Sequence, residues 1–248
     1  RSTRTPRMTA AGRALVEQAR QVLRQAAVFE RTAKAIAAGL EPALALAIDS
    51  FVPTEPLIRG LAGLRERYPD LAVTLFTEGI GAAERRVRDG SATLGLCALL
   101  PTAVQDLQAA TLTQVSLVPV TAPEHPLASE RRELTRDVLA EHMQLILTDP
   151  LQRPGPSFSV VSPRVWRFVD IARRLEFLLA GFGWGTMPQH LVQAHLDAGR
   201  LVALEVQDPG VLPGSIGLYA IHDRRRPLGV GARWLLEELQ RQPWFGPA

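Results

Sequence analysis

Apolar residues recur every third or fourth position over the first forty residues. The seven positions follow a 4,3,4,3,4,3 spacing and are Leu15, Ala19, Val22, Ala26, Phe29, Ala33 and Ile36. This spacing predicts one seam of a long helix, with Thr9 at its N-cap and Gly39 at its end. A narrow, alanine-rich seam needs a partner helix, either in the same chain or in a second copy. The sustained heptad and the charged opposite face favour a dimer.

Beyond this helix, apolar runs typical of buried strands alternate with helical periodicity. Strands are expected at residues 43–49, 71–76 and 93–97, with helices at 53–67 and 82–89 between them. This β-α-β-α-β order predicts a mostly parallel sheet.

The second half of the chain repeats the alternation. The expected elements are a strand at 115–122, a turn at 123–128, a helix at 135–141, strand 144–148, a proline-rich loop at 150–163, strand 165–170, helix 171–180, strand 185–187, helix 189–198, strands 201–206 and 216–222, and a helix at 229–240. The sequence therefore predicts an α/β protein with two lobes. Ligands of open α/β sheets bind at the carboxyl ends of strands, so we expect a cleft between the lobes.

The segment "AGFGWGTMP" at residues 180–188 carries glycines at a spacing close to that of nucleotide-binding loops. A dinucleotide loop follows a strand and opens a helix, whereas this segment follows a helix and leads into a strand. Gly181 is therefore expected to cap the preceding helix, and Gly183 to allow a close backbone approach. Trp184 either packs in the core or shows its ring to a ligand, and we favour the core.

Charge is distributed unevenly along the 248 residues. Residues 1–36 hold eight basic and two acidic side chains, a local balance of +6, whereas the whole chain carries +3. A basic arm is thus joined to a slightly acidic body. Such an arm is suited to the phosphate backbone of DNA, although for a charge run alone a solvated helix surface is the favoured explanation.

Candidate chemistry is sparse. The single cysteine and five scattered histidines form no metal-ligand cluster, and no nucleotide-binding or nucleophile motif has its required context. We therefore expect neither an enzyme nor a cofactor. No apolar run has the length of a membrane span, and no signal peptide is evident, so a cytoplasmic location is expected.

Four segments, taken in order, resemble one family. They are "RSTRTPRMTAAGRALVEQARQVL", "LVPVTAPEHPLA", "LLAGFGWGTMP" and "LYAIHDRRRPLGVGARWLLEEL". The chain resembles LysR-type transcriptional regulators of bacteria over essentially its whole length. The resemblance implies a winged helix-turn-helix domain, a dimerising linker helix, and an effector domain similar to type II periplasmic binding proteins.

The resemblance also implies a domain organisation. Residues 1–8 would end the winged helix-turn-helix, and 9–39 would form the linker helix. Lobe I would comprise 40–122 and 222–248, and lobe II 123–221. The recognition helix would then precede the chain, which would begin inside the wing. Promoter DNA would be bound through that missing domain, with Arg1, Arg4 and Arg7 offering phosphate contacts only.

An effector site between the lobes is implied as well. The expected lining residues are Ser50, Phe51, Val52, Thr54, Ile80, Cys97, Thr148, Asp170, Gly183 and Trp184. Ile80 stands where relatives often have Ser or Thr, which suggests a more apolar effector. Ser50 and Thr54 could instead be helix N-caps. Cys97 could be a redox sensor, but a buried, inert thiol is favoured.

The implied mechanism is a population shift. A small molecule binding between the lobes would reorient them and change the spacing of the paired DNA-binding heads. The family assembles as a homodimer or a dimer of dimers. A stand-alone solute receptor of the periplasmic type, or a two-lobed enzyme, would be the alternatives.

Overall fold

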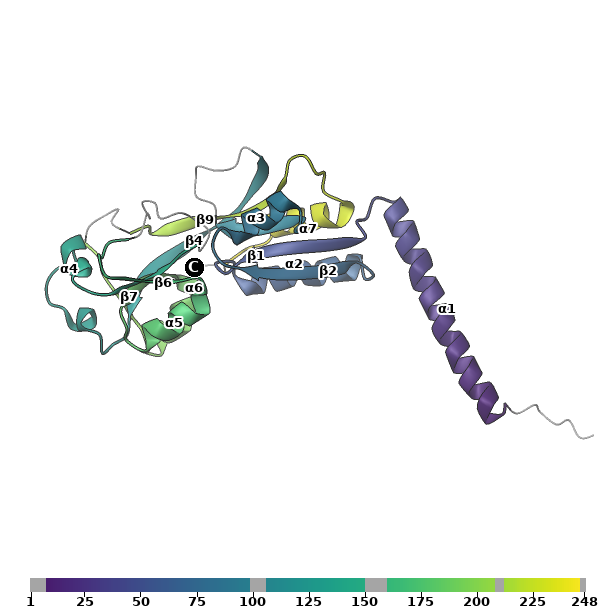
Figure 1. The fold of residues 1–248 in the computed structure, drawn as a ribbon, viewed down its shortest axis with the longest axis horizontal. Coiled ribbons are helices and arrows are strands. Elements are labelled where there is room, and N and C mark those ends of the chain that lie inside the picture. Colours follow the sequence, from purple (N-terminus) through teal and green to yellow (C-terminus); the bar gives the residue numbers. More distant parts are fainter. Residues whose placement is uncertain (1–7, 99–105, 150–159, 208–211, 246–248) are drawn as a thin grey trace, which may run out of the picture.

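The N-terminal region forms one long helix that stands apart from the body (Figure 1). The computed structural model describes residues 8–98, 106–149, 160–207 and 212–245. Helix α1 spans Ala10–Ala37, and Thr9 Oγ1 accepts a hydrogen bond from Gly12 N at 3.0 Å. Gly39, with φ of 88°, ends it. Both predicted ends of this helix are confirmed.

Three parallel strands form the core of the first half of the sheet. β1 (Ala43–Asp49) pairs with β2 (Ala72–Glu78) on one side and β3 (Leu94–Ala98) on the other. Helices α2 (Thr54–Arg67) and α3 (Ala82–Asp89) make the crossovers. The predicted β-α-β-α-β unit is therefore confirmed.

Alternation along β1 decides which side chain joins which layer. Leu44, Leu46 and Ile48 pack with α2 and with the C-terminal helix α7 (Val230–Arg241). Ala47 points the other way, into a smaller core beneath α3. The sheet is thus covered on both faces, as a parallel sheet requires.

Two antiparallel strands connect the halves of the sheet. β4 (Leu107–Thr121) pairs with β9 (Ser215–Asp223) over residues 107–116 and then with β7 over 117–121. The strand order is β2-β1-β3-β9-β4-β7-β5-β6. The expectation of a mostly parallel sheet is therefore wrong for the centre, because β9 runs antiparallel to both β3 and β4.

The remaining strands and short helices build the second half. They are β5 (Gln144–Leu147), β6 (Val165–Phe168), β7 (Trp184–Pro188), β8 (Val202–Ala203), α4 (Arg136–Ala140), α5 (Ile171–Leu179), α6 (Gln189–Asp197) and the 3-10 turn Pro126–Ser129. Both β6 and β7 run parallel to β5. We call β2, β1, β3 and β9 the first half-sheet, and β7, β5 and β6 the second half-sheet.

Two strand predictions had wrong lengths. β4 begins at Leu107 rather than 115, because its first half pairs with β9 although it lacks an apolar run. The strand expected at 201–206 shrinks to two residues paired with β4. At the next position Leu204 N still donates to Pro119 O at 2.9 Å, but Pro119 has no N–H to return a bond. The proline-rich segment 150–159 lies outside the described residues. Within the part of the chain that the structure describes, no helix is long and apolar enough to cross a membrane.

Candidate functional site

The two half-sheets meet where their parallel strands end. The turn at residues 79–81 follows β2, and a Cβ on Gly79 would lie 3.0 Å from the main-chain oxygen of Val169, which follows β6. A Cβ on Gly81 would clash with Asp149, which follows β5. We call this contact, together with the ends of β1 and β3, the junction. It occupies the position at which open α/β sheets bind ligands.

Apolar side chains from both halves fill part of the junction. Phe51, two residues after β1, and Ile80 belong to one cluster with Phe168 and Ile171 of the second half-sheet. Phe51 is buried and Ile80 half-buried. Phe51 and Ile80, two predicted site residues from separate loops, thus pack together against the second half-sheet.

Asp49, which the sequence analysis did not single out, is the most unusual group at the junction. It ends β1 and is only 1% exposed. Its Oδ1 accepts hydrogen bonds from Phe51 N at 3.0 Å and from Ser50 Oγ at 3.4 Å. Among the described residues, Oδ2 has no hydrogen-bond partner. Burial raises the pKa of Asp49 to about 6.

A second buried carboxylate ties the half-sheets together. Asp149 forms an ion pair with Arg85 of α3, and its side chain is 3% exposed against 36% for the arginine. Beside it, Thr148 is half-buried and its N–H donates to the oxygen of Phe168 at 2.8 Å. This ion pair crosses the junction, so any change in the relative position of the halves must disturb it.

The other residues expected around β1 occupy different environments. Val52 is buried in the core under α2 and α7, away from the second half-sheet. Thr54 is exposed as the first residue of α2. Pro53 is the N-cap of that helix and no side chain caps it, so the capping alternative for Ser50 and Thr54 is wrong.

On the second half-sheet, Asp170 is an exposed N-cap of α5. Its Oδ1 accepts from Arg173 N at 2.6 Å, so one of its oxygens is already occupied. This residue lies next to Val169 of the junction, and its side chain serves the helix end.

The glycine-rich segment turns a helix into a strand, as expected. Gly181, with φ of 74°, follows α5, and its N–H donates to Leu178. A Cβ on Gly183 would lie 2.3 Å from the main-chain oxygen of Met143, so only glycine fits. Trp184 is 0% exposed and its Nε1 donates to Leu139 O at 3.1 Å. Its indole belongs to the core of the second half, separate from the junction cluster.

Cys97 lies in the core beneath α3. It is 1% exposed among small apolar side chains such as Ala47 and Val87. Burial raises the pKa of the thiol, and the charge of Asp49 adds to that effect. Because the thiolate is the reactive form, this environment favours the inert interpretation.

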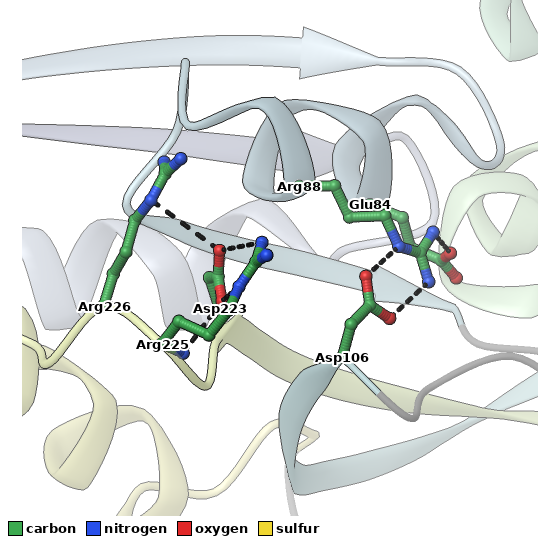
Figure 2. Close-up of polar contacts among 6 residues, drawn as sticks. All are labelled: Glu84, Arg88, Asp106, Asp223, Arg225 and Arg226. Carbon is green, nitrogen blue, oxygen red and sulfur yellow. Dashed lines mark hydrogen bonds and ion pairs between the residues drawn. The ribbon is translucent and has the colours of Figure 1, made fainter.

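A separate polar cluster surrounds the end of β9. Figure 2 shows Asp223 held by Arg225 and Arg226, and Arg88 lying between Glu84 and Asp106. A cavity of about 110 Å³ adjoins it, lined in part by Asp223 and Arg226. Each arginine drawn has a carboxylate partner, so the cluster is balanced in charge and supports the fold.

The dimerisation seam predicted for α1 is exposed to solvent. All seven seam residues are exposed on α1, including the large side chains Leu15, Val22, Phe29 and Ile36 at 46–74%. One ion pair, between Arg31 and Asp70 at 2.8 Å, connects the helix to the body. Arg1, Arg4 and Arg7 lie outside the described residues. No group of three metal-ligating side chains occurs within the described ranges.

Comparison with known proteins shows which family shares this architecture. A family model described as the LysR substrate binding domain matches residues 37–244. Among curated proteins, the chain is similar to the HTH-type transcriptional regulator AceR of Acinetobacter baumannii. The two are 26% identical over 246 residues, which cover 98% of this chain and 81% of AceR.

Solved structures share the fold at low sequence identity. The effector binding domain of QuiR in complex with shikimate superposes with a TM-score of 0.63 at 13% identity, covering 80% of this chain and 95% of that domain. A full-length BenM variant superposes with a TM-score of 0.59 at 17% identity, covering 96% of this chain and 79% of BenM.

Proposed function

This chain belongs to the LysR family of transcriptional regulators and carries an effector-binding domain, and from that premise we propose that its effector binds at the junction. The observation that carries the proposal is Asp49. A buried carboxylate with one unpartnered oxygen lies where two neighbouring parallel strands end, bonded to the main chain of Phe51, whose side chain joins the apolar cluster shared by both halves. Buried polar groups are ordinarily satisfied, so this oxygen lacks a partner that a ligand can supply.

The likeness to QuiR supports a small-molecule effector. That domain holds shikimate, a small molecule, within the same fold. We infer that lobe I, residues 40–122 and 222–248, and lobe II, residues 123–221, enclose the effector of this chain between them. Phe51, Ile80 and Thr148 would then contact it, with Ser50 beside the carboxylate of Asp49.

Signal transmission would work by a shift between two lobe orientations. The Arg85–Asp149 ion pair and the contact of Gly79 with Val169 hold the halves in the present arrangement. An effector that binds one orientation better shifts the population toward it, by no more than its difference in affinity for the two. The body would pass this change to α1 through residues 38–42.

We further propose that α1 dimerises through its seam. The four large apolar side chains named above are exposed in the single chain, and burying each is worth roughly 1.5–3 kcal/mol. A second copy offers the same seam, so the pairing is self-complementary. A homodimer, or a dimer of dimers, would set the spacing of paired DNA-binding domains on promoter DNA in the bacterial cytoplasm. Arg1, Arg4 and Arg7 would contact phosphates.

A thermal-shift screen tests the location of the site. The full chain is heated with members of a panel of small carboxylates, aromatics, amines and amino acids, and stabilising compounds are measured again with Ser50→Ala and Thr148→Ala. We expect at least one variant to lose most of the shift. Ser129→Ala and Thr111→Ala, both exposed and outside the junction, are the matched controls and should keep it. A compound that stabilises all four variants equally binds elsewhere, and that result contradicts the proposed site.

A further inference from the structure

We propose that Asp49 anchors the effector through a cationic nitrogen, so that the effector class is an amine, amidine or guanidine attached to an apolar body. This inference rests on the proposed function for the location of the site and adds the chemistry that the site selects. The first step of the argument is the state of the carboxylate itself.

Only one oxygen of Asp49 takes part in local structure. Oδ1 accepts from Phe51 N and Ser50 Oγ, which fixes the turn after β1. Oδ2 is buried and has no hydrogen-bond partner among the described residues. Within those same residues, no arginine, lysine or histidine forms an ion pair with Asp49, although this carboxylate is 1% exposed. A buried charge left without a counter-ion is costly, and a ligand cation relieves that cost.

The neighbouring charges do not compensate it. The titratable groups around this corner of the sheet are Cys97 on β3 and the pair Glu84 and Arg88 on α3. Glu84 is already paired with Arg88 at 2.7 Å, and the thiol carries no positive charge. Arg85 is engaged by Asp149 across the junction. The uncompensated charge at this place is therefore negative.

The buried arginine of the second half-sheet does not change this balance. Arg174 of α5 donates from Nε to Leu145 O and from Nη2 to Thr186 O, both at 2.9 Å. The guanidinium of Arg174 is thus hydrogen-bonded to main-chain carbonyls of the second half-sheet. An anionic effector seated beside Asp49 would meet like charge, whereas a cation would form a charge-assisted hydrogen bond with Oδ2.

The apolar neighbours define the rest of the ligand. Phe51 and Ile80 come from the first half, and Phe168 and Ile171 from the second, within one cluster. An aromatic or aliphatic body would pack between them while its nitrogen reaches the end of β1. An aromatic ring such as Phe51 also attracts a cation through its face. The pairing of one buried carboxylate with these side chains selects a cation with an apolar body over a polar zwitterion.

Shape-matched probes test the charge preference. Benzamidine, benzamide and benzoate have nearly the same size but are cationic, neutral and anionic, and phenethylamine with 3-phenylpropionate forms a second pair. Binding to the full chain is measured by calorimetry and thermal shift at pH 7.5. We expect the two cations to bind and the neutral and anionic probes to bind at least tenfold more weakly.

Two variants connect that preference to Asp49. Asp49→Asn keeps the acceptor Oδ1 and removes the charge, and we expect it to weaken benzamidine at least tenfold. Asp223→Asn removes another buried carboxylate, one that Arg225 already pairs, and should leave benzamidine binding unchanged. If Asp49→Asn does not fold, the pH dependence of the natural chain replaces it. Because the pKa of Asp49 is about 6, benzamidine affinity should fall about tenfold between pH 7.5 and pH 5.

Three results would overturn the inference. They are no binding by either cation, cation binding that is the same in Asp49→Asn, and tighter binding of benzoate than of benzamidine. The last result separates this inference from the proposed function. If benzoate binds and Thr148→Ala abolishes its binding, the junction remains the effector site and only the cationic class is wrong.

Discussion

Replacing Asp49 by asparagine should change how the stability of the folded chain depends on pH. Burial raises the pKa of this carboxyl from 3.8 to about 6, so the folded state holds the proton more tightly than the unfolded state does. A shift of about 2 pKa units corresponds to about 3 kcal/mol, because each unit is worth 1.36 kcal/mol. Asp49 therefore makes the folded chain less stable at neutral pH than an uncharged residue would.

The sign follows from the two pKa values. Well below pH 3.8 the carboxyl is protonated in both states and carries no penalty. As pH rises from about 4 to about 6, the unfolded state ionises first, and stability is lost until the folded state ionises too. Above that window the penalty is constant. Asparagine does not titrate, so the variant lacks this loss.

The expected gain at pH 7.5 is smaller than the full penalty. The asparagine amide places an N–H₂ group where Oδ2 stood, and an unsatisfied buried donor costs about 1–3 kcal/mol. We therefore expect Asp49→Asn to be about 0–2 kcal/mol more stable than the natural chain at pH 7.5. On going to pH 4 the stability difference should fall by about 2–3 kcal/mol, so that the variant becomes no more stable than the natural chain or less stable.

Urea denaturation between pH 4 and pH 7.5 measures the difference directly. Asp223→Asn is the control, because its arginine partners lower the pKa of Asp223 to about 2. The difference in free energy of unfolding between Asp223→Asn and the natural chain should stay nearly constant above pH 5. Parallel curves for the natural chain and Asp49→Asn over the whole range would refute the reasoning, since they would mean that Asp49 has an ordinary pKa.

Three further predictions concern packing and assembly. Gly183→Ala should destabilise the fold by about 2 kcal/mol or more in urea denaturation, because the added Cβ would meet the main-chain oxygen of Met143. Gly214→Ala is the control and should leave stability unchanged, because the space around Gly214 is open. Arg85→Met should cost about 1–2 kcal/mol in the same assay, because it removes the ion-pair partner of Asp149, and an unchanged midpoint would contradict that. Phe29→Glu should convert dimers to monomers in light scattering, whereas Gln25→Glu, off the seam, should not.

Much of the fold could be predicted because local signals and packing agree. The long helix carries its own cap at Thr9 and its own stop at Gly39, and the strands of the first half-sheet are apolar runs. The first half of β4 has no such run. Its pairing with β9, some hundred residues away, comes from topology rather than from its own side chains.

The candidate site was predicted less well for a related reason. Phe51 and Ile80 follow strands, so the family resemblance places them at the junction, where the structure has them. The unpartnered oxygen of Asp49 depends on a turn after β1 that directs Phe51 N and Ser50 Oγ to the other oxygen, which no sequence pattern encodes. A signal was nevertheless present, because an aspartate ending the otherwise apolar run "ALALAID" is an unusual choice for a buried strand.

A crystal structure of the full chain with bound benzamidine tests the central claim most directly. The account predicts the amidinium within hydrogen-bond distance, about 3 Å, of Asp49 Oδ2, with its ring against Phe51 and Ile80. Density for the probe in the cavity beside Asp223 and Arg226, with the junction unchanged, would contradict it.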